Sequence, residues 1–256
     1  MKRIPSTTNP IIKVILIPSL LIATCLPLMA QKNETQKKAV TPSHPSFEAV
    51  EDVEGLPLVL LIGDSISMGY TLPVRKALQG KANVHRPKAN GGPTATGLKY
   101  IDKWLADGKW DVIHFNWGLH DVMHYLGSTA KEDRVPHTTE DAVRRSTEKQ
   151  YEQNLRDLVA KLQATGATLI WASTTPIPNS SKGMWKPGDA ELYNRIAAKV
   201  MADNGIAVDD LWGFTKPKLE EIQKDGDVHF SAEGSAYLGT EVARVILEAL
   251  EKQKSG

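Results

Sequence analysis

The amino-acid sequence predicts a single three-layer α/β/α domain whose central sheet has five, mostly parallel, strands. Apolar runs of strand length recur along the chain, and each is followed by a segment in which apolar residues have helical spacing. Strands that alternate with helices imply a parallel sheet with right-handed crossovers and helices on both faces. The composition fits one ordinary globular domain, since 41% of the residues are hydrophobic and 24% are charged.

Five short runs supply the predicted strands. The first, residues 58–62, is unbroken and apolar, as expected for a strand buried on both faces of a sheet. The other four runs, in chain order, cover residues 82–85, 110–116, 168–174 and 206–208. The order of the runs along the chain leaves room for a helix after each of them.

The helices between these strands are predicted from apolar residues spaced three or four apart. Residues 70–78 form the first, with Pro73 tolerable near its start, and a second follows the loop at residues 88–94. Residues 139–164 predict a long helix that ends at Gly166. Residues 189–204 predict a helix closed by Gly205, and the last amphipathic helix begins near Ala232.

The first 30 residues have the pattern of an export signal, with basic residues at the start, an apolar core and the small residue Ala30. The apolar stretch is short for a membrane span and contains Pro18 and Pro27. We therefore expect cleavage after Ala30 and a secreted or periplasmic chain without a stable membrane span. Lipid attachment at Cys25 is the alternative.

Cys25 is the only cysteine, so a cleaved chain has no disulfide, zinc–thiolate site or cysteine nucleophile. Residues 31–55 are polar and lack periodicity, and we expect a flexible linker before a domain that spans residues 56–256. The net charge of +1, with both signs intermixed, argues against a nucleic-acid partner. The glycines lack the spacing of a dinucleotide or phosphate-binding loop, so no cofactor is expected.

Ser65 has the most informative position in the chain. It follows Gly63 and Asp64 in a turn between the first predicted strand and a helix. In open α/β sheets this carboxyl end of a strand is where ligands bind. A serine there can present its hydroxyl to a cleft, and the free N–H groups of the helix amino terminus favour an oxyanion. Capping of the helix is the purely structural alternative.

A possible base for Ser65 lies near the other end of the chain. A serine hydroxyl needs a base to take its proton, and the base needs a third group to fix its tautomer. His229 lies in the loop that opens the last helix, two residues after Asp227 and four after Asp225. Alternate residues of an extended loop point to the same side, which favours Asp227 as the partner of the imidazole. The alternatives are Asp225 as the acid, or a Ser–His dyad without an acid.

Two more loops follow the second and third predicted strands. Gly91 and Gly92 form a pair that lets the backbone approach a ligand closely. The third strand ends at Asn116 and leads into Gly118-Leu119-His120-Asp121. Four loops in the order Ser, Gly, polar donor and Asp/His, each at a strand end or opening a helix, favour nucleophilic hydrolysis.

This order of blocks resembles the SGNH (GDSL-type) hydrolase superfamily, and the resemblance covers residues 58–250. It implies that Ser65 is the catalytic nucleophile and that the backbone N–H of Gly92 contributes to the oxyanion hole. The third block of the family is Gly-x-Asn-Asp, so His120 stands where the family has asparagine. Imidazole can donate from Nε2, and Asn116 is another candidate donor.

The last block of the family is Asp-x-x-His, whereas Gly226 stands three residues before His229 in this chain. The resemblance implies a flavodoxin-like fold and a serine esterase that acts on small acyl esters. Together with the predicted export, it makes an O-acetylated polysaccharide the favoured substrate. A lipid esterase or lysophospholipase, and a catalytically silent carbohydrate-binding module, are the alternatives.

Two other patterns need an interpretation. His120 and His124 have the spacing of a zinc-binding helix, but they directly follow a strand and no third ligand is evident, so no metal is expected. The loop at residues 176–187 is long enough to be a substrate-side feature. Three tryptophans near predicted loops are candidates either for stacking on sugar rings or for packing: Trp117, Trp185 and Trp212.

Overall fold

The computed structural model describes residues 44–105, 108–126, 134–181 and 183–255, which belong to one compact unit, Pro42–Gly256. The predicted export signal, with Cys25, lies outside the described residues. Among the residues that are described, no helix has both the length and the apolar character needed to cross a bilayer.

Five strands form the central sheet in the order β2-β1-β3-β6-β7, and every pairing within it is parallel. The strands are β1 (Leu58–Ile62), β2 (Asn83–His85), β3 (Val112–Phe115), β6 (Thr168–Ala172) and β7 (Ala207–Asp209). Each coincides with one of the five predicted runs to within two residues at either end. The predicted α/β/α class is therefore confirmed.

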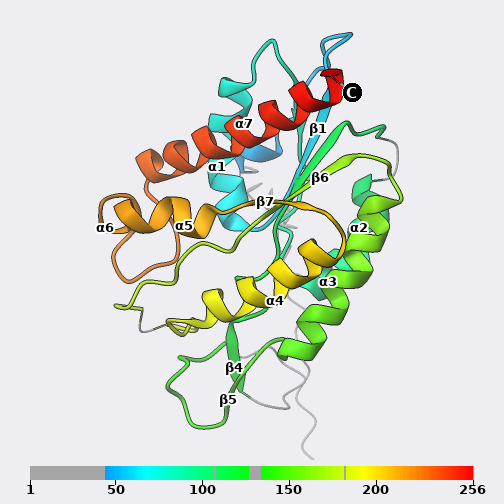
Figure 1. The fold of residues 1–256 in the computed structure, drawn as a ribbon. Coiled ribbons are helices and arrows are strands. Elements are labelled where there is room, and N and C mark those ends of the chain that lie inside the picture. The colour runs from blue at the N-terminus through cyan, green and yellow to red at the C-terminus, as the bar shows by residue number, and fades with distance from the viewer. Residues whose placement is uncertain (1–43, 106–107, 127–133, 182, 256) are drawn as a thin grey trace, which may run out of the picture. The chain divides into compact units, whose positions relative to one another are not determined.

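Helices cover both faces of this sheet (Figure 1). Alternate residues of β1 point to opposite faces: Val59 and Leu61 pack against one core cluster, and Leu60 and Ile62 against the other. The first cluster includes residues of α1 (Ser65–Ala77) and α7 (Ala232–Ser255). The second includes residues of α2 (Thr94–Leu105), α3 (Glu148–Gln163) and α4 (Asp189–Asp203). After β7 come α5 (Leu211–Thr215), the 3-10 helix η2 (Lys216–Lys218) and α6 (Leu219–Ile222).

The prediction of a helix over residues 139–164 is wrong for the first residues of that range. Residues Ala142–Arg144 form a strand, β5, that pairs antiparallel with β4 (His124–Leu126) outside the main sheet. The helix α3 begins later because Thr147 and Gln150 form a capping box, in which each side chain accepts the other residue's backbone N–H. Since His124 lies on β4, the two histidines of the zinc-like pattern do not share a helix face.

The end of the predicted linker packs against the domain. Pro45–Phe47 form a short 3-10 helix, η1, in which Ser46 is fully buried. The N–H of Val53 donates to Oδ1 of Asn83 at 2.9 Å, and Nδ2 of Asn83 donates to the carbonyl of Val53 at 3.0 Å. The packed unit therefore begins ahead of residue 56, the boundary expected from composition.

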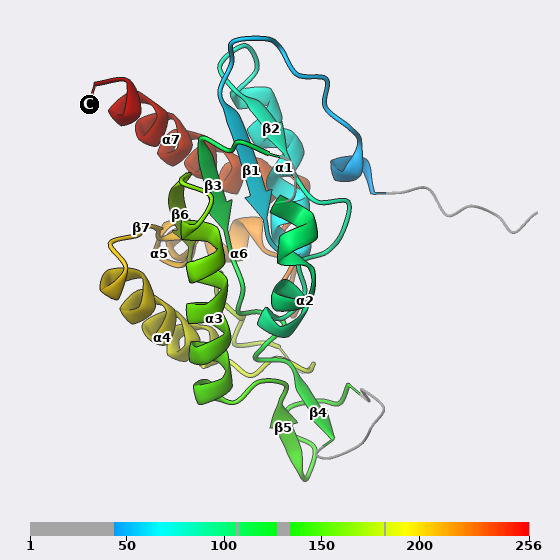
Figure 2. The ribbon, with the colours of Figure 1, turned by 90° about the vertical axis from the view of Figure 1, so that its right-hand side faces the viewer.

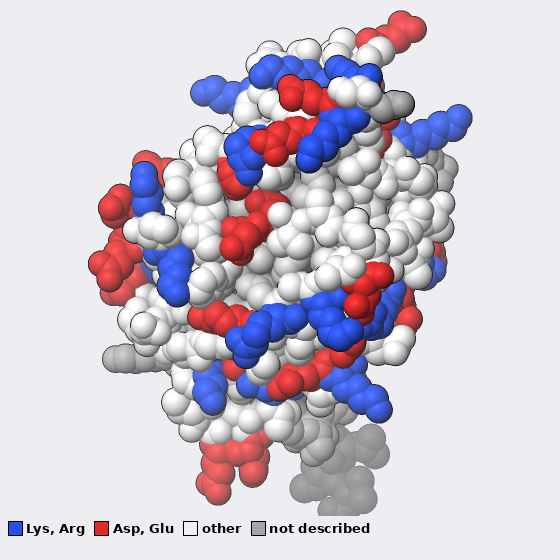
Figure 3. Space-filling model, in the orientation of Figure 1, with Lys and Arg blue, Asp and Glu red and all other residues white. Residues whose placement is uncertain are grey.

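The surface carries charges of both signs. Figure 3 shows acidic and basic side chains intermixed around a largely uncharged centre on the face that it presents. This distribution agrees with the net charge of +1.

Candidate active site

Ser65 is the first residue of α1 and lies three residues beyond the end of β1. Asp64 caps the helix, because its Oδ1 accepts the N–H of Ile66 at 2.9 Å. A side chain at position 63 would not fit, since its Cβ would lie 2.7 Å from Cβ of Ser67. The sequence Gly-Asp-Ser thus forms a tight turn that fixes Ser65 at the carboxyl edge of the sheet.

The hydroxyl of Ser65 and the imidazole of His229 form a hydrogen bond of 2.9 Å between Oγ and Nε2. On the other side of the ring, Nδ1 of His229 lies 2.8 Å from Oδ1 of Asp227. An Nδ1–H that donates to this carboxylate leaves Nε2 free to accept the proton of Ser65. Burial alone would raise the pKa of Asp227, but hydrogen bonds from the side chain and backbone of His229 hold that pKa below its usual value.

The loop that carries His229 is a tight reversal with its own backbone hydrogen bonds. The N–H of Lys224 donates to the carbonyl of His229 at 2.9 Å, and the N–H of Asp227 donates to the carbonyl of Lys224 at 3.1 Å. Gly226 takes a φ of +64° in this turn, a conformation that favours glycine. Val228, fully buried, anchors the loop, and the next side chain, His229, faces Ser65.

Of the two carboxylates considered from the sequence, the structure brings Asp227 to the imidazole. The other, Asp225, accepts a hydrogen bond from Oγ of Ser180 at 3.3 Å. That contact links the His229 loop to the loop at residues 176–187. Asp225 is exposed and is oriented toward this second loop.

The loop with the paired glycines lies directly beside the nucleophile turn. The N–H of Gly91 donates to the carbonyl of Gly63 at 2.9 Å, and a Cβ at position 91 would lie 2.9 Å from that same oxygen. Gly92 has a φ of +58°. Its N–H, expected in the oxyanion hole, donates to Oδ1 of the exposed Asn90 at 2.9 Å. A ligand oxygen would have to replace Asn90 to use this donor.

Asp121 is a buried carboxylate that joins three segments of the site. It accepts hydrogen bonds from the N–H and the hydroxyl of Thr94, at 3.0 and 2.6 Å, and from the hydroxyl of Ser146 at 2.7 Å. Burial raises the pKa of Asp121 to about 6, although these hydrogen bonds act in the opposite direction. Its hydrogen bonds to Thr94, the first residue of α2, fix the Gly91–Gly92 loop relative to the turn that carries His120.

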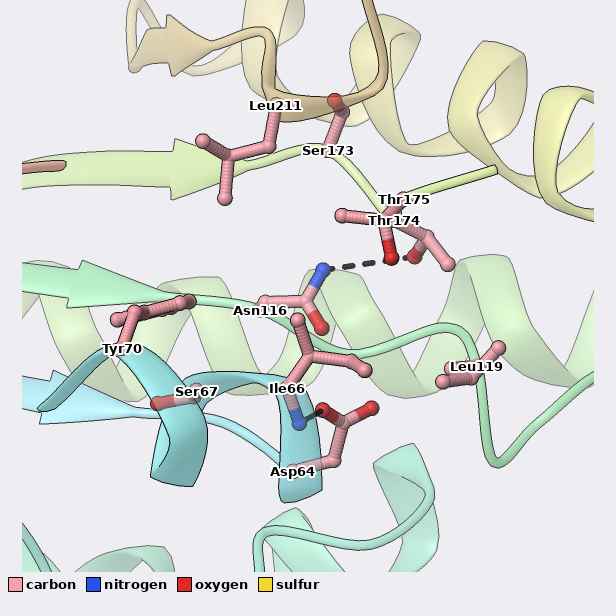
Figure 4. Close-up of a pocket in the computed structure, with 10 residues that line it drawn as sticks. All are labelled: Asp64, Ile66, Ser67, Tyr70, Asn116, Leu119, Ser173, Thr174, Thr175 and Leu211. Carbon is pink, nitrogen blue, oxygen red and sulfur yellow. Dashed lines mark hydrogen bonds between the residues drawn. The ribbon is translucent and has the colours of Figure 1, made fainter. Parts of the chain in front are cut away.

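The structure places His120 and Asn116 differently. Burial lowers the pKa of His120, and the carboxylate of Asp64 in the nucleophile turn acts in the opposite direction. A neutral imidazole has one N–H to donate. Nδ2 of Asn116 instead donates to the carbonyl of Ala172 at 2.8 Å and is directed toward β6 (Figure 4). Asn116 as an oxyanion donor is therefore not favoured by the structure.

A small cavity lies behind the nucleophile turn (Figure 4). Its volume of about 10 Å³ has room for roughly one water molecule and for no acyl chain. The hydroxyl of Thr175, which lines it, is buried without a hydrogen-bond partner among the described residues. The cavity is therefore part of the packing behind the nucleophile turn and is not an acyl-binding pocket. It is lined by Asp64, Ile66, Ser67, Tyr70, Asn116, Leu119, Ser173, Thr174, Thr175 and Leu211.

The three tryptophans pack within the protein. Trp117 is fully buried, and its Nε1 donates to the carbonyl of Gly91 at 3.3 Å. Nε1 of Trp185 donates to the carbonyl of Leu119 at 2.9 Å, beside His120. The ring of Trp212 is covered by Nζ of Lys216 at 4.1 Å. Trp117 and Trp185 therefore stabilise the loops of the site from behind, which is the packing alternative considered from the sequence.

The sequence profile of the GDSL-like Lipase/Acylhydrolase family matches residues 61–237. The chain belongs to this family of ester-hydrolysing enzymes, and its Gly-Asp-Ser turn lies at the start of the matched region. No functionally curated protein matches the sequence.

Solved structures with a similar fold include three acylhydrolases. A lipase/acylhydrolase from Enterococcus faecalis has a TM-score of 0.59 at 19% identity, over 75% of this chain and 95% of that one. The acetyl xylan esterase AlAXEase has a TM-score of 0.57 at 17% identity, over 74% and 99%. An acetylxylan esterase from Geobacillus stearothermophilus has a TM-score of 0.57 at 18% identity, over 75% and 93%. At these identities the likeness shows the fold.

Proposed function

We propose that this acylhydrolase is a serine esterase that removes small acyl groups, with Ser65, His229 and Asp227 as its catalytic triad. The observation that carries the proposal is the hydrogen-bonded series from Oγ of Ser65 through the imidazole to Asp227, with distances of 2.9 and 2.8 Å. Few other side-chain arrangements join a nucleophile, the base that takes its proton and the acid that orients the base in one hydrogen-bonded series.

In the first half of the reaction, Oγ of Ser65 attacks the ester carbonyl carbon while Nε2 of His229 takes the hydroxyl proton. The tetrahedral intermediate then expels the alcohol, which receives that proton from the imidazolium. In the second half, water attacks the acyl-Ser65 ester with the same help, and the carboxylic acid leaves. Asp227 keeps its proton-free form throughout and stabilises the imidazolium.

The oxyanion of each intermediate would be held by N–H donors around Ser65. Ser65 is the first residue of α1, so its N–H has no carbonyl within the helix to donate to and is available to an oxyanion. We assign a second donor to Nε2 of His120. The N–H of Gly92 becomes the third when the oxyanion replaces Asn90 as its acceptor. Loss of one such donor typically lowers kcat about a hundred- to a thousandfold.

O-acetylated polysaccharide is the substrate that we favour, in a secreted or periplasmic setting. Two features support it: the export pattern in the first 30 residues, and the likeness in fold to acetylxylan esterases. Comparison of acetylated xylan, p-nitrophenyl esters of increasing chain length and a lysophospholipid as substrates tests this choice. Activity that rises with acyl length or is confined to the lysophospholipid would favour the lipid esterase instead.

The central experiment is the substitution Ser65→Ala, assayed on p-nitrophenyl acetate together with labelling by an organophosphonate probe. We expect turnover and labelling to disappear while the melting temperature stays near the wild-type value. Ser180→Ala, which changes an exposed serine of the neighbouring loop, is the matched control and should keep both. Wild-type turnover in Ser65→Ala would refute the mechanism, and absence of labelling in the wild type would favour a silent binding module.

Export has a separate test. Amino-terminal sequencing of protein recovered outside the cytoplasm should give a chain that begins near Gln31. An intact Met1 would contradict cleavage. A lipid on Cys25 at the amino terminus would show that the protein is anchored.

A further inference from the structure

A buried arginine lies behind the nucleophile turn and takes no direct part in the chemistry described above. Arg86 follows β2 and is only 7% exposed. Its Nη1 donates to Oγ1 of Thr71 at 2.8 Å and to Oγ of Ser67 at 3.3 Å, both on α1. A lone arginine after a short strand is typical of an exposed loop, so residue type gives no sign of this burial.

The other terminal nitrogen of this guanidinium contacts the two loops of the site. Nη2 of Arg86 donates to the carbonyl of Gly63 at 3.2 Å and to the carbonyl of Ala89 at 3.3 Å. The carbonyl of Gly63 is also the acceptor of the Gly91 N–H. One cation thus fixes both the peptide that precedes Asp64 and the chain that leads into the paired glycines.

The hydrogen-bond acceptors of Arg86 among the described residues are all neutral oxygens. Burial lowers the pKa of Arg86 to about 10, so the side chain is still charged at neutral pH. A buried cation is expensive to desolvate, and apolar packing of similar volume often stabilises a protein as well or better. Stability alone therefore gives no reason for an arginine here, whereas a planar group that donates to several fixed acceptors suits the alignment of two loops.

We propose that Arg86 is a positioning residue that sets the distance between Ser65 and the Gly91–Gly92 backbone, and with it the geometry of the oxyanion hole. The inference rests on the proposed function and assigns no contact with the substrate. A displacement of about 1 Å between a nucleophile and its oxyanion donors is enough to lower the rate about a hundredfold. The expected consequence of losing Arg86 is therefore a change in kcat.

The guanidinium is covered from outside by η1, near the start of the packed unit. The ring of Phe47, on η1, lies 5.6 Å from Cζ of Arg86, a cation–π contact. Figure 2 shows η1 beside α1. The residues predicted as the end of a flexible linker thus shield the cation that supports the active-site loops.

Arg75 provides a matched control. It lies on α1, is partly buried and donates from Nε to the carbonyl of Val84 at 3.0 Å, a contact with β2 and not with either loop. We expect Arg86→Met to lower kcat for p-nitrophenyl acetate about a hundredfold and Arg86→Lys about tenfold, with KM within about threefold of wild type. Arg75→Met should lower the melting temperature but keep kcat.

Chemical rescue adds a measurement that a purely structural role would not change. Methylguanidinium added to Arg86→Ala should restore part of kcat with saturation, and it should leave Arg75→Ala unchanged. Wild-type kcat in Arg86→Lys, or losses in the Arg86 variants no larger than in Arg75→Met, would overturn the inference. If Arg86→Met does not fold, Arg86→Lys decides. A wild-type protein without Ser65-dependent turnover would instead refute the proposed function itself.

Discussion

The two sides of the proposed site are built in different ways. On the nucleophile side the supporting polar groups are buried: Asp64 is 3% exposed, Arg86 7% and Asp121 fully buried. On the base side, the side chains of His229 and Asp227 are 38% and 42% exposed. One side is held by hydrogen bonds inside the protein and the other by the backbone of a surface loop.

This difference separates activity from stability. Buried hydrogen-bonded groups leave an unsatisfied partner when one of them is removed, which typically destabilises a protein by about 1–3 kcal/mol. Substitutions of these buried supporting groups should therefore lower stability as well as kcat. Substitutions of the exposed catalytic side chains, Asp227 and His229, should lower kcat and leave the melting temperature almost unchanged.

Asp227→Asn should lower kcat about ten-thousandfold, as the equivalent change does in a serine protease triad, with little change in KM. An amide does not stabilise the imidazolium as a carboxylate does, and it favours the wrong tautomer. The melting temperature should stay within about 2 °C of wild type because the side chain is exposed. Asp225→Asn is the matched control, with kcat within about threefold. Equal, small effects of both changes would indicate a dyad.

His120→Ala should lower kcat about a hundredfold, equivalent to about 3 kcal/mol of transition-state stabilisation. His120→Asn should keep much of the activity, since an amide can donate from a similar place. Asn116→Ala should chiefly lower the melting temperature, because its amide donates to the carbonyl of Ala172. An unchanged kcat in His120→Ala, or a larger loss of kcat in Asn116→Ala, would remove His120 from the oxyanion hole.

Asp121 should make stability depend on pH. Its pKa rises from 3.8 to about 6 on folding, so the folded state binds the proton more tightly than the unfolded state does. Its contribution to stability is therefore fully present below about pH 4 and is lost as the pH rises to about 6. The wild type should be most stable relative to Asp121→Asn at the acidic end of this range. Thermal melts of both proteins between pH 3.5 and 7 measure it.

The control for this titration is Asp157→Asn, which changes an exposed carboxylate of α3. Because this side chain is exposed, its substitution should change the melting temperature little. A difference between wild type and Asp121→Asn that does not change with pH would show that the folded protein does not raise the pKa of Asp121.

Gln223→Met should have the smallest effect. Nε2 of Gln223 donates to the carbonyls of Pro176 and Val228, at 2.9 and 3.2 Å, and so connects the His229 loop to the rest of the chain. Loss of these bonds should lower kcat by about threefold and stability by about 1 kcal/mol. Steady-state kinetics and chemical denaturation measure the two effects. A fall in kcat as large as that of Asp227→Asn would show that the backbone hydrogen bonds within the loop are not enough to hold His229 in place.

Much of the fold could be predicted because its signals are local. The run at residues 58–62 is apolar throughout since both faces of β1 are covered, and that pattern is visible in the sequence. The strands β4 and β5 could not be found in this way, because each has three residues and includes a polar one, His124 or Arg144. The capping box at Thr147 and Gln150 was a readable signal for the start of α3.

In the candidate site, too, the features that depend on neighbouring residues could be predicted and those that depend on distant segments could not. The Gly-Asp-Ser turn and the proximity of Asp227 to His229 follow from neighbouring residues, so the sequence was enough to propose them. The surroundings of Asp121 and Arg86 depend on contacts between segments far apart in the chain. Nothing next to Arg86 in the sequence indicates that it is buried. The bond from the Gly92 N–H to Asn90 likewise depends on a side-chain orientation that residue type leaves open.

The hydrogen bond between Ser65 and His229 joins two positions that are 164 residues apart in the chain. The first lies on the first strand-to-helix turn of the sheet and the second just before the last helix. A proteolytic fragment therefore contains both groups only if it spans residues 65–229. Recovery of esterase activity after dilution from denaturant would therefore report completion of folding, later than the recovery of helical circular dichroism.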